Sequence, residues 1–271
     1  MDNADLNKPI GIFDSGIGGL TVFAEIRKHL PQESLIYLGD TARVPYGSKS
    51  TETVIRYSLE NARFLRDRQV KAIVVACNTA SALALPTLAR DFELPIIGVV
   101  RPGAKAALVA TNNKVIGVIG TQATIASEAY SKALKECDDQ VKVVSQACPL
   151  FVPLVEEGWV DNDVAELVAR KYLSGIKAEN IDVLVLGCTH YPVLKSVINK
   201  VVGNEIKLID SAQATAQALA QMLEKKNLQI LAKTNFTPEH QIYVTDLPAR
   251  FETIASKFLG KDLPQVKHIS F

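Results

Sequence analysis

The sequence predicts an α/β protein with two pseudo-symmetric domains, each a doubly wound parallel sheet, and an active site in the cleft between them. Three observations lead to this fold class: short apolar runs rich in β-branched residues, helix-period segments between these runs, and a repeat of the same plan in two halves of the chain. Continuous apolar runs are typical of parallel strands covered on both faces. Their alternation with helices is typical of doubly wound folds.

The apolar runs begin near the N-terminus and recur as far as residue 246. The predicted strands are 9–14, 35–39, 72–77, 95–100, 115–121, 141–148, 182–188, 206–210 and 242–246. Between them, apolar residues at helical spacing predict helices at 51–68, 123–136, 162–173, 211–226 and 249–259. Because no low-complexity linker separates these elements, any boundary between domains is a short crossing of the chain.

The internal repeat pairs two strand ends in one half of the chain with two in the other. The first pair is VVACNTASAL (74–83) and VLGCTHYPVL (185–194), and the second is GIFDSG (11–16) and GVIGTQ (117–122). Ligands of open α/β sheets collect at the carboxyl ends of the strands. Two such ends that face each other would form a cleft with one cysteine on each wall.

The repeat also predicts where the domains divide. We expect a first lobe made of residues 1–99 together with 211–271, which carries Cys77. We expect a second lobe made of residues 100–210, which carries Cys188. The chain would then cross twice between the lobes, and a two-lobed molecule can close on its ligand and exclude water.

The composition limits the class of protein. Among 271 residues, 48% are apolar and 22% are charged, and the formal net charge is +1, so nothing indicates nucleic acid as a partner. The apolar runs are too short to span a bilayer. The first residues, MDNADLNKPIGIF, are acidic and polar and resemble neither a signal peptide nor a transit peptide. We therefore expect a cytoplasmic protein without a membrane partner.

Four cysteines are present, at 77, 137, 148 and 188, and no C-x-x-C motif occurs. A cytosolic compartment keeps such thiols reduced, and the spacing does not match a zinc site, so we predict neither a disulfide nor a bound metal. A cysteine at the end of an apolar strand is most often a small core residue. That interpretation holds for Cys137 and Cys148, whereas the repeat favours a functional role for Cys77 and Cys188.

Two opposed thiols can invert a stereocentre without any cofactor. One thiolate removes a proton from carbon, and the other thiol delivers a proton to the opposite face. An ordinary thiol has a pKa near about 8.5, so its thiolate needs support from a cation or from helix N–H groups. Cys77 and Cys188 each come just before a predicted helix start, where backbone N–H groups favour an anion.

Polar turns near the cysteines are candidate ligand-binding segments. DSGIGG (14–19) is a glycine-rich turn that lacks the dinucleotide and Walker patterns, yet its N–H groups could approach a carboxylate, with Asp14 and Ser15 at the strand end. PYGSKS (45–50) is a second turn with hydroxyl and N–H donors, for which a plain surface loop is the alternative. His190, two residues after Cys188, could tune the thiol, although a lone histidine is more often structural.

Seven motifs in order resemble the bacterial glutamate racemase family over residues 9 to 260. They are GIFDSGIGGLTV, LGDTARVPYGSKS, ACNTASA, VIGT, CPLFVPLVEEG, GCTHYPVL and KFLG. The resemblance implies that Cys77 removes the α-proton of D-glutamate and Cys188 that of L-glutamate. It further implies that Asp14 and His190 assist the thiols, with Glu156 as a further candidate for this support.

The resemblance also implies which residues bind the substrate. They are Asp14, Ser15, Tyr46, Gly47, Asn78, Thr79, Thr121, Thr189 and His190. It implies no pyridoxal phosphate and no metal, a homodimer, and a product, D-glutamate, that feeds peptidoglycan synthesis in the cytoplasm.

Three alternatives stay open at the level of sequence. A racemase of aspartate or another acidic amino acid would use the same two thiols. A non-catalytic amino-acid-binding protein could share the two-lobed plan, and it would leave the α-hydrogen in place. A thiol oxidoreductase would join Cys77 and Cys188 in a disulfide under mild oxidant.

Overall fold

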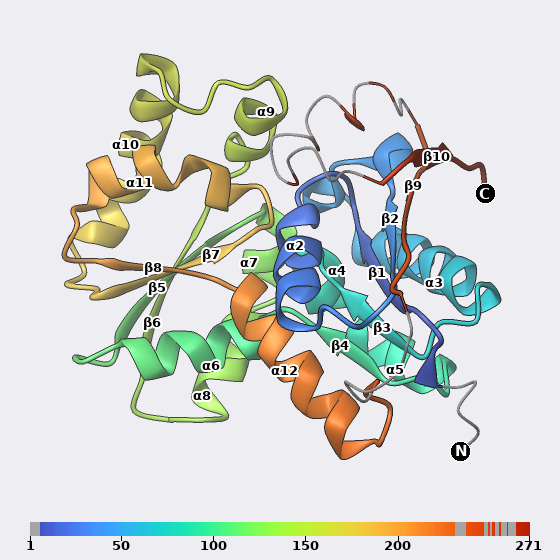
Figure 1. Ribbon diagram of the computed structural model, residues 1–271. Helices are drawn as coiled ribbons and strands as arrows, with labels where there is room; N and C mark the ends of the chain where they lie inside the picture. Colours follow the sequence, from blue (N-terminus) through green and yellow to red (C-terminus); the bar gives the residue numbers. More distant parts are fainter. Residues whose placement is uncertain are drawn as a thin grey trace.

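The computed structural model describes residues 6–230, 237–246, 249, 251–252, 255, 259 and 264–271. Within these residues the chain forms two β-sheets, and every strand pairing in both is parallel. Helices cover both faces of each sheet, with the first sheet on the right and the second on the left in Figure 1. The predicted fold class, two doubly wound α/β units, is confirmed.

The first sheet combines strands from the beginning and the end of the chain. In spatial order they are β10 (Val266–His268), β9 (His240–Val244), β2 (Leu35–Gly39), β1 (Ile10–Asp14), β3 (Ala72–Val75) and β4 (Ile96–Gly98). Residues of β1, β2 and β3 are all buried, as their continuous apolar sequences predict. The sheet therefore has its core strands in the centre and shorter strands at its edges.

The second sheet comes from the middle of the chain. Its spatial order is β6 (Lys142–Ala147), β5 (Val115–Gly120), β7 (Val183–Gly187) and β8 (Lys207–Asp210). The order 6-5-7-8 repeats the order 2-1-3-4 of the first sheet, so β5 corresponds to β1 and β7 to β3. The internal repeat read from the sequence is thus a repeat of topology, and its two cysteines follow corresponding strands.

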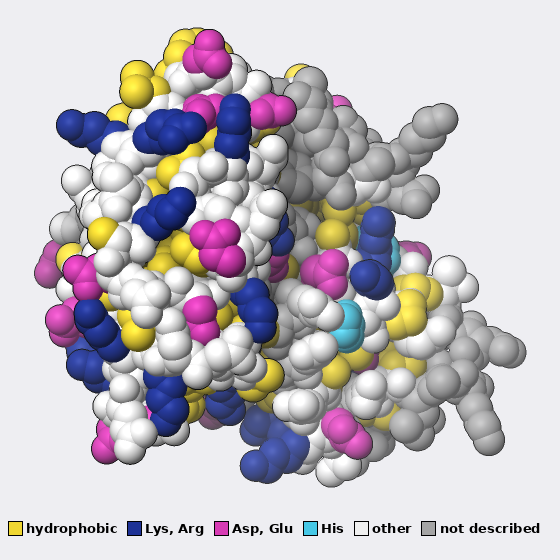
Figure 2. Space-filling view, turned by 90° about the vertical axis from the view of Figure 1, so that its left-hand side faces the viewer, with side chains coloured by type: hydrophobic (Ala, Val, Ile, Leu, Met, Phe, Trp, Pro, Cys, Tyr) yellow, Lys and Arg dark blue, Asp and Glu magenta, His cyan; other side chains and the backbone are white. Residues whose placement is uncertain are grey.

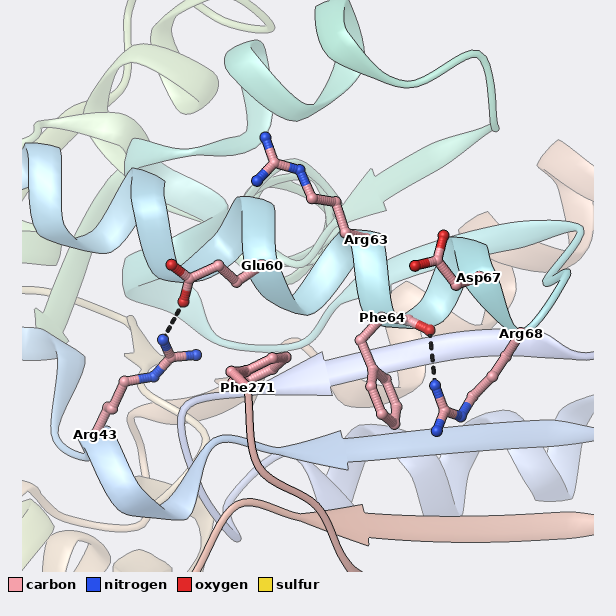
Figure 3. Close-up of a pocket in the computed structure, with 7 residues that line it drawn as sticks. All are labelled: Arg43, Glu60, Arg63, Phe64, Asp67, Arg68 and Phe271. Atoms are coloured by element: carbon pink, nitrogen blue, oxygen red, sulfur yellow. Dashed lines mark hydrogen bonds and ion pairs between the residues drawn. The ribbon is translucent and has the colours of Figure 1, made fainter.

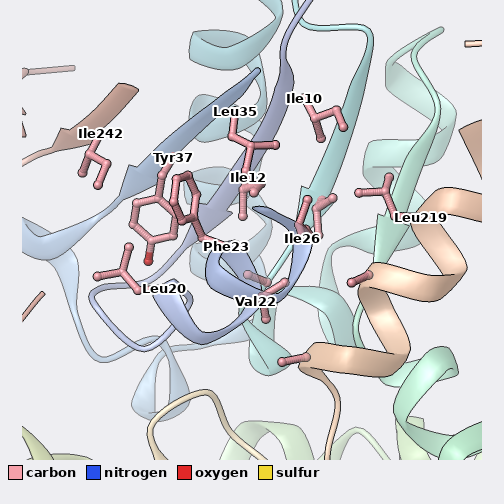
Figure 4. Packing of buried hydrophobic residues seen from close by; sticks show 14 of the residues in the cluster. Ile10, Ile12, Leu20, Val22, Phe23, Ile26, Leu35, Tyr37, Leu219 and Ile242 are labelled. Carbon is pink, nitrogen blue, oxygen red and sulfur yellow. The ribbon is translucent and has the colours of Figure 1, made fainter. Parts of the chain in front are cut away.

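On one face of the first sheet, α2 (Leu20–His29) and α12 (Ala212–Lys225) form a continuous apolar cluster with the strands. Figure 4 shows Phe23 of α2 against Tyr37 of β2, with ring centroids 6.0 Å apart and an edge-to-face geometry. Leu219 of α12 closes the cluster from the other side. Each large side chain buried here contributes about 1.5–3 kcal/mol of hydrophobic stabilisation.

Other helices cover the remaining faces. The opposite face of the first sheet holds α3 (Thr51–Asp67), α4 (Asn78–Leu83) and α5 (Leu85–Asp91). The second sheet is covered on one face by α6 (Val100–Ala110) and α8 (Ala129–Lys135), and on the other by α9 (Phe151–Glu156), α10 (Asp163–Lys177) and α11 (Lys195–Val202). Both sheets are therefore enclosed, which explains their parallel strands.

Several elements differ from the sequence prediction. The helix expected at 123–136 is two helices, α7 (Gln122–Ala126) and α8, because Glu128 takes a left-handed conformation with φ of 56°. The run 141–148, expected to be buried on both faces, is the edge strand β6 and is half exposed. Strand β10 lies in a segment for which no strand was predicted.

Two predictions, the helix at 249–259 and the domain boundaries, are not settled by the described residues. The helix expected at 249–259 lies largely outside the described residues, as does the KFLG motif. The first sheet draws on residues before 99 and after 240, and the second on residues 115 to 210. The domain boundaries at 99/100 and 210/211 stay a prediction.

Acidic and basic side chains are interspersed on the face shown in Figure 2. Apolar side chains lie between them, and no extended region of one charge stands out on that face. Among the described helices, none combines the length and the apolar character needed to span a bilayer.

Candidate active site

The central strands of each sheet deliver the site residues in corresponding positions. Strands β1 and β3 are parallel neighbours, so the residues just after them lie together, and Cys77 Sγ is 3.7 Å from Ser15 Oγ. Strands β5 and β7 are likewise neighbours, with Gly120 beside Gly187. The residues after these strands, Thr121 and Cys188, form the matching edge of the second sheet.

Both edges line one small cavity of about 20 Å³. Its lining residues are Ser15, Pro45, Tyr46, Gly47, Cys77, Asn78, Thr79, Thr121, Val152, Cys188, Thr189 and His190. This space is far below the about 300–1,000 Å³ of small-molecule sites, so a ligand can enter only if the two edges move apart. Most of the lining residues carry a hydroxyl, thiol, amide or imidazole group, which can contact the polar groups of a small ligand.

Cys77 is the N-terminal cap of α4 and is buried. Its sulfur accepts a hydrogen bond of 3.5 Å from the N–H of Ala80, which is the helix support that the sequence predicts. Burial and the nearby charge of Asp14 nevertheless raise the pKa of the Cys77 thiol to about 12, against the opposing effect of the Ala80 and Ser15 contacts. Cys77 is therefore a thiol at neutral pH.

Cys188 has a different polar neighbour. A short 3₁₀ helix (Tyr191–Leu194) precedes α11, and the N–H of Tyr191 bonds to the carbonyl of Cys188 rather than to its sulfur. The sulfur lies 3.9 Å from Nδ1 of His190, whose Nε2 lies 3.3 Å from Glu156 Oε1. The sequence predicts backbone N–H groups beside the Cys188 sulfur. The structure instead places the His190 ring there, and the Glu156 carboxylate lies on the other side of that ring.

His190 is buried, and its protonation follows from its two neighbours. Burial alone would lower the pKa of His190, but contacts with Cys188 and Glu156 outweigh it and raise the pKa to about 10. The ring is then an imidazolium at neutral pH. A cation beside a cysteine stabilises its thiolate form.

Asp14 lies behind the cavity wall, not on it. It is completely buried, and its carboxylate accepts hydrogen bonds from the Gly16 N–H at 3.0 Å and from the Thr189 hydroxyl at 3.3 Å. Burial raises the pKa of Asp14, while His190 and these donors work in the opposite direction. Its contacts place it between the two cysteine-bearing edges, where it can orient Thr189.

Three threonine hydroxyls from the two sheets meet in one cluster. Thr79 Oγ1 is 2.9 Å from Thr121 Oγ1 and 3.1 Å from Thr124 Oγ1, and the last two are 2.9 Å apart. Thr79 follows β3, whereas Thr121 and Thr124 follow β5. The cluster therefore joins the two edges beside the cavity.

Asn78 presents an unused donor. Its side-chain oxygen accepts a hydrogen bond of 2.7 Å from the Tyr130 hydroxyl, while its Nδ2 is buried without a hydrogen-bond partner in the described part of the protein. A buried polar group without a partner is costly. Because Asn78 lines the cavity, this amide is a ready donor for an acceptor on a bound ligand.

Tyr46 and Gly47 line the cavity from a turn of 3₁₀ helix, Tyr46–Ser48. Backbone N–H groups at a helix start have no partner inside the helix, so they are available to an anion. Gly47 packs so closely on Thr121 that a Cβ at this position would overlap its side chain. The side-chain hydroxyl of Tyr46 bonds to Asp40, away from a ligand role.

The cavity brings together most of the residues predicted from sequence. Those that line it are Cys77, Cys188, His190, Ser15, Tyr46, Gly47, Asn78, Thr79, Thr121 and Thr189. Asp14 and Glu156 do not line it, and each contacts a residue that does. Sequence reasoning missed Thr124, Tyr130 and Val152, which stand on helices whose placement depends on how the two halves pack.

The other two cysteines do not line the cavity. Cys137 is exposed, and Cys148 is buried in the apolar cluster of the second sheet. Burial, with a smaller contribution from Cys188, raises the pKa of Cys148 above the usual thiol range. Within the described residues, no group of three or more histidine, cysteine or acidic side chains is arranged to hold a metal ion.

Comparison with protein families finds one that matches most of the chain. Residues 20–219 match the family described as Asp/Glu/Hydantoin racemase. A protein of Geobacter metallireducens named glutamate racemase is 55% identical over 263 residues, which cover 97% of each chain.

Solved structures extend the likeness to three dimensions. Glutamate racemase isoform RacE1 from Bacillus anthracis superimposes with a TM-score of 0.92 at 42% identity, covering 97% of both chains. A glutamate racemase from Francisella tularensis in complex with D-glutamate gives a TM-score of 0.90 at 41% identity, covering 98% of both chains.

Proposed function

The chain belongs to the glutamate racemases within the Asp/Glu/hydantoin racemase family, and from this membership we propose that it interconverts L- and D-glutamate by a two-thiol mechanism. The observation that carries the mechanism is that Cys77 and Cys188, from corresponding strand ends of two sheets, line the same cavity. An α-carbon held between them would meet one sulfur on each face.

The reaction needs one base and one acid, and the two thiols supply both. For L-glutamate, the Cys188 thiolate takes the α-hydrogen as a proton, and the electron pair of the C–H bond stays on the α-carbon and its carboxylate. The Cys77 S–H bond then breaks, and its proton bonds to the opposite face of the α-carbon. The products are D-glutamate, a Cys188 thiol and a Cys77 thiolate. An enzyme with these two protonation states can start the reverse reaction on D-glutamate.

The geometry and charges of the site suit the L-to-D direction. The raised pKa of Cys77 keeps it a proton donor, and the charged ring of His190 lies 3.9 Å from the sulfur of Cys188. Glu156 holds His190 through Nε2. Asp14 acts as a positioning residue through Thr189.

The developing negative charge next to the substrate carboxylate needs fixed donors. The amide of Asn78, the hydroxyls of Ser15 and Thr121, and the N–H groups of the Tyr46–Ser48 turn are available around the cavity. The same donors match the two carboxylates of an acidic amino acid.

Isotope exchange tests the proposal. L- and D-glutamate, and both enantiomers of aspartate, are incubated with the protein in heavy water and followed by polarimetry and proton NMR. A two-base mechanism predicts that glutamate racemises and that deuterium first accumulates in the product enantiomer, because the second thiol carries solvent deuterium. If glutamate binds and keeps its α-hydrogen, the proposal is wrong. If aspartate is racemised faster than glutamate, the substrate is aspartate and not glutamate.

The proposal includes the setting in which the enzyme works. D-Glutamate would supply peptidoglycan synthesis, and with it cell-wall biogenesis and cell shape, in the cytoplasm. We propose that catalysis is cofactor-independent, since the acid and the base are both protein side chains, and that neither nucleic acid nor membrane is a partner. We propose a homodimer as the active assembly, which light scattering at working concentration would test.

The lobes predicted from sequence, 1–99 with 211–271 and 100–210, are part of the same proposal. Their contacts at the site are polar, including the Thr79–Thr121 hydroxyl contact and the Asn78–Tyr130 hydrogen bond. Such contacts can separate to admit a ligand at lower cost than an apolar interface. Closure then excludes water from the proton-transfer step.

A further inference from the structure

The hydroxyl of Tyr46 is committed to a network that lies outside the cavity. It donates to Asp40 Oδ2 and accepts a hydrogen bond of 3.0 Å from Asn61 Nδ2. Asp40 is completely buried, and its other oxygen accepts a 3.1 Å bond from the Thr245 hydroxyl. Burial and the charge of Asp40 raise the pKa of Tyr46, so its hydroxyl stays a neutral donor.

Arg43 neutralises this buried carboxylate. Its Nε lies 2.9 and 2.8 Å from the two oxygens of Asp40, and its Nη1 pairs with Glu60, as Figure 3 shows. Burial alone would lower the pKa of Arg43, but the carboxylates of Asp40 and Glu60 reverse this and raise it. The guanidinium is therefore always charged, and the carboxylates of Asp40 and Glu60 together fix its orientation.

Two aromatic rings cover the guanidinium. Its central carbon lies 4.1 Å from the ring centroid of Tyr57 and 4.6 Å from that of Phe271. Figure 3 shows Phe271 between Arg43 and the helix that carries Glu60 and Phe64. The planar stacking and the forked hydrogen bonds together require arginine at this position, since lysine can provide neither.

A plain structural ion pair is the alternative explanation. Exposed pairs contribute little to stability, but Asp40 is 0% exposed and the side chain of Arg43 is 19% exposed. The network also ends on Tyr46, which lines the cavity and precedes Gly47. Gly47 in turn rests on Thr121 of the other cavity edge.

We infer that Arg43 is a positioning residue for the substrate, acting through Asp40 and the hydroxyl of Tyr46 to hold the Tyr46–Gly47 turn against its ligand. The inference rests on the proposed racemase function and assigns a role to residues outside the cavity. Phe271 belongs to the same unit, because its ring stacks on the guanidinium of Arg43.

Kinetics of Arg43→Met, Tyr46→Phe and the double variant test the inference. The turn would bind a group common to both enantiomers and both states of the reaction, so its loss acts on binding. We expect Arg43→Met to raise KM about tenfold for L- and for D-glutamate, with kcat within about twofold of wild type. Tyr46→Phe should give a similar rise, and the double variant should be no worse than the worse single variant, because both break one chain of contacts.

Arg66→Met is the matched control, since Arg66 lies on α3 as Glu60 does, but is exposed and pairs with Asp67. Arg43→Lys keeps the positive charge beside Asp40 and Glu60 but neither the stacking nor the forked bonds, so its KM should lie between those of wild type and Arg43→Met. Tyr46→Phe removes one oxygen and keeps the packing, so it tests the inference even where Arg43→Met unfolds. Two outcomes with an active wild type would overturn the inference and leave the proposed function in place. In the first, Arg43→Met and Tyr46→Phe have the same KM and kcat as Arg66→Met. In the second, the effects of Arg43→Met and Tyr46→Phe on KM add in the double variant. If the wild-type protein neither racemises nor binds glutamate, both the proposed function and this inference are wrong.

Discussion

The hydroxyl of Thr189 donates a hydrogen bond of 3.3 Å to the carboxylate of Asp14, although 175 positions separate them in the chain. Asp14 ends β1 of the first sheet, and Thr189 follows Cys188 after β7 of the second. The bond joins the two strand ends that carry the site. The same residues that shape the cavity therefore hold its two walls together, so site geometry and inter-sheet contact depend on each other.

Gly18→Ala should disturb this junction. A Cβ at Gly18 would lie 2.8 Å from His190 Nδ1 and 2.9 Å from the carbonyl carbon of Thr189, and would overlap the Thr189 hydroxyl. Forcing the two turns apart should cost about 1–3 kcal/mol of unfolding free energy and most of the activity. Urea denaturation and a racemisation assay measure both quantities.

Gly175→Ala is the control for this prediction. Gly175 lies within α10, and a Cβ there meets no atom within 4 Å. It should leave activity unchanged and raise stability by about 0.5–1 kcal/mol, because alanine favours the helix. Equal behaviour of the two alanine variants would mean that the close approach at Gly18 is not needed.

Cys77→Ser and Cys188→Ser should each abolish racemisation. Serine is a far weaker base at neutral pH, and loss of a general acid or base lowers the rate by about 10²–10⁴-fold. Steady-state assays in both directions give the size of the loss. Cys137→Ser is the control, because Cys137 is exposed and remote from the cavity lining. Wild-type rates in Cys77→Ser or Cys188→Ser would remove that thiol from the mechanism.

Asn78→Ala should weaken glutamate binding. The buried Nδ2 of Asn78 has no hydrogen-bond partner in the described part of the protein, so a ligand carboxylate would be its natural acceptor. Hydrogen bonds to charged groups contribute about 1.5–3 kcal/mol, which corresponds to a loss of affinity of about 10- to 150-fold. Calorimetric titration with D-glutamate measures it.

Tyr130→Phe tests the Asn78 side-chain oxygen separately from its Nδ2. It removes the donor to the Asn78 oxygen at 2.7 Å and leaves Nδ2 in place. The affinity loss should be clearly smaller than that of Asn78→Ala. If Tyr130→Phe weakens binding as much as Asn78→Ala does, then Asn78 acts by supporting the fold and not by donating to the ligand.

Much of the fold could be predicted because the central strands are continuous apolar runs and because the plan repeats. Elements decided by tertiary context could not. Glu128 takes a left-handed conformation that glycine or asparagine would have signalled, so the break between α7 and α8 was not visible. The run 141–148 looks buried, yet it forms an edge strand. That outcome depends on the order of strands, which apolar character alone does not encode.

The candidate site was predictable to the extent that its residues lie in motifs after strands. Thr124 and Tyr130 reach the site from α7 and α8, and their partners Thr79 and Asn78 begin α4, which follows β3 of the first sheet. Nothing local marks such a pairing. Tyr46 shows a different limit, since the motif predicts a ligand contact but does not reveal that its hydroxyl faces Asp40.

His190 should give the protein a stability that declines with rising pH. Its pKa is about 10 in the folded chain, where contacts with Cys188 and Glu156 overcome the effect of burial, against an ordinary value of 6.5. The folded state therefore holds a proton that the unfolded state releases between these values, and stability falls as pH rises through this window. The deficit of His190→Asn relative to wild type should be largest below about pH 6.5 and vanish near pH 10. Urea denaturation of both proteins at pH 6, 8 and 10 measures it, with Glu156→Gln expected to narrow the window. Parallel stability curves for wild type and His190→Asn would show that His190 is neutral in the folded protein and would remove its cationic support from the Cys188 thiolate.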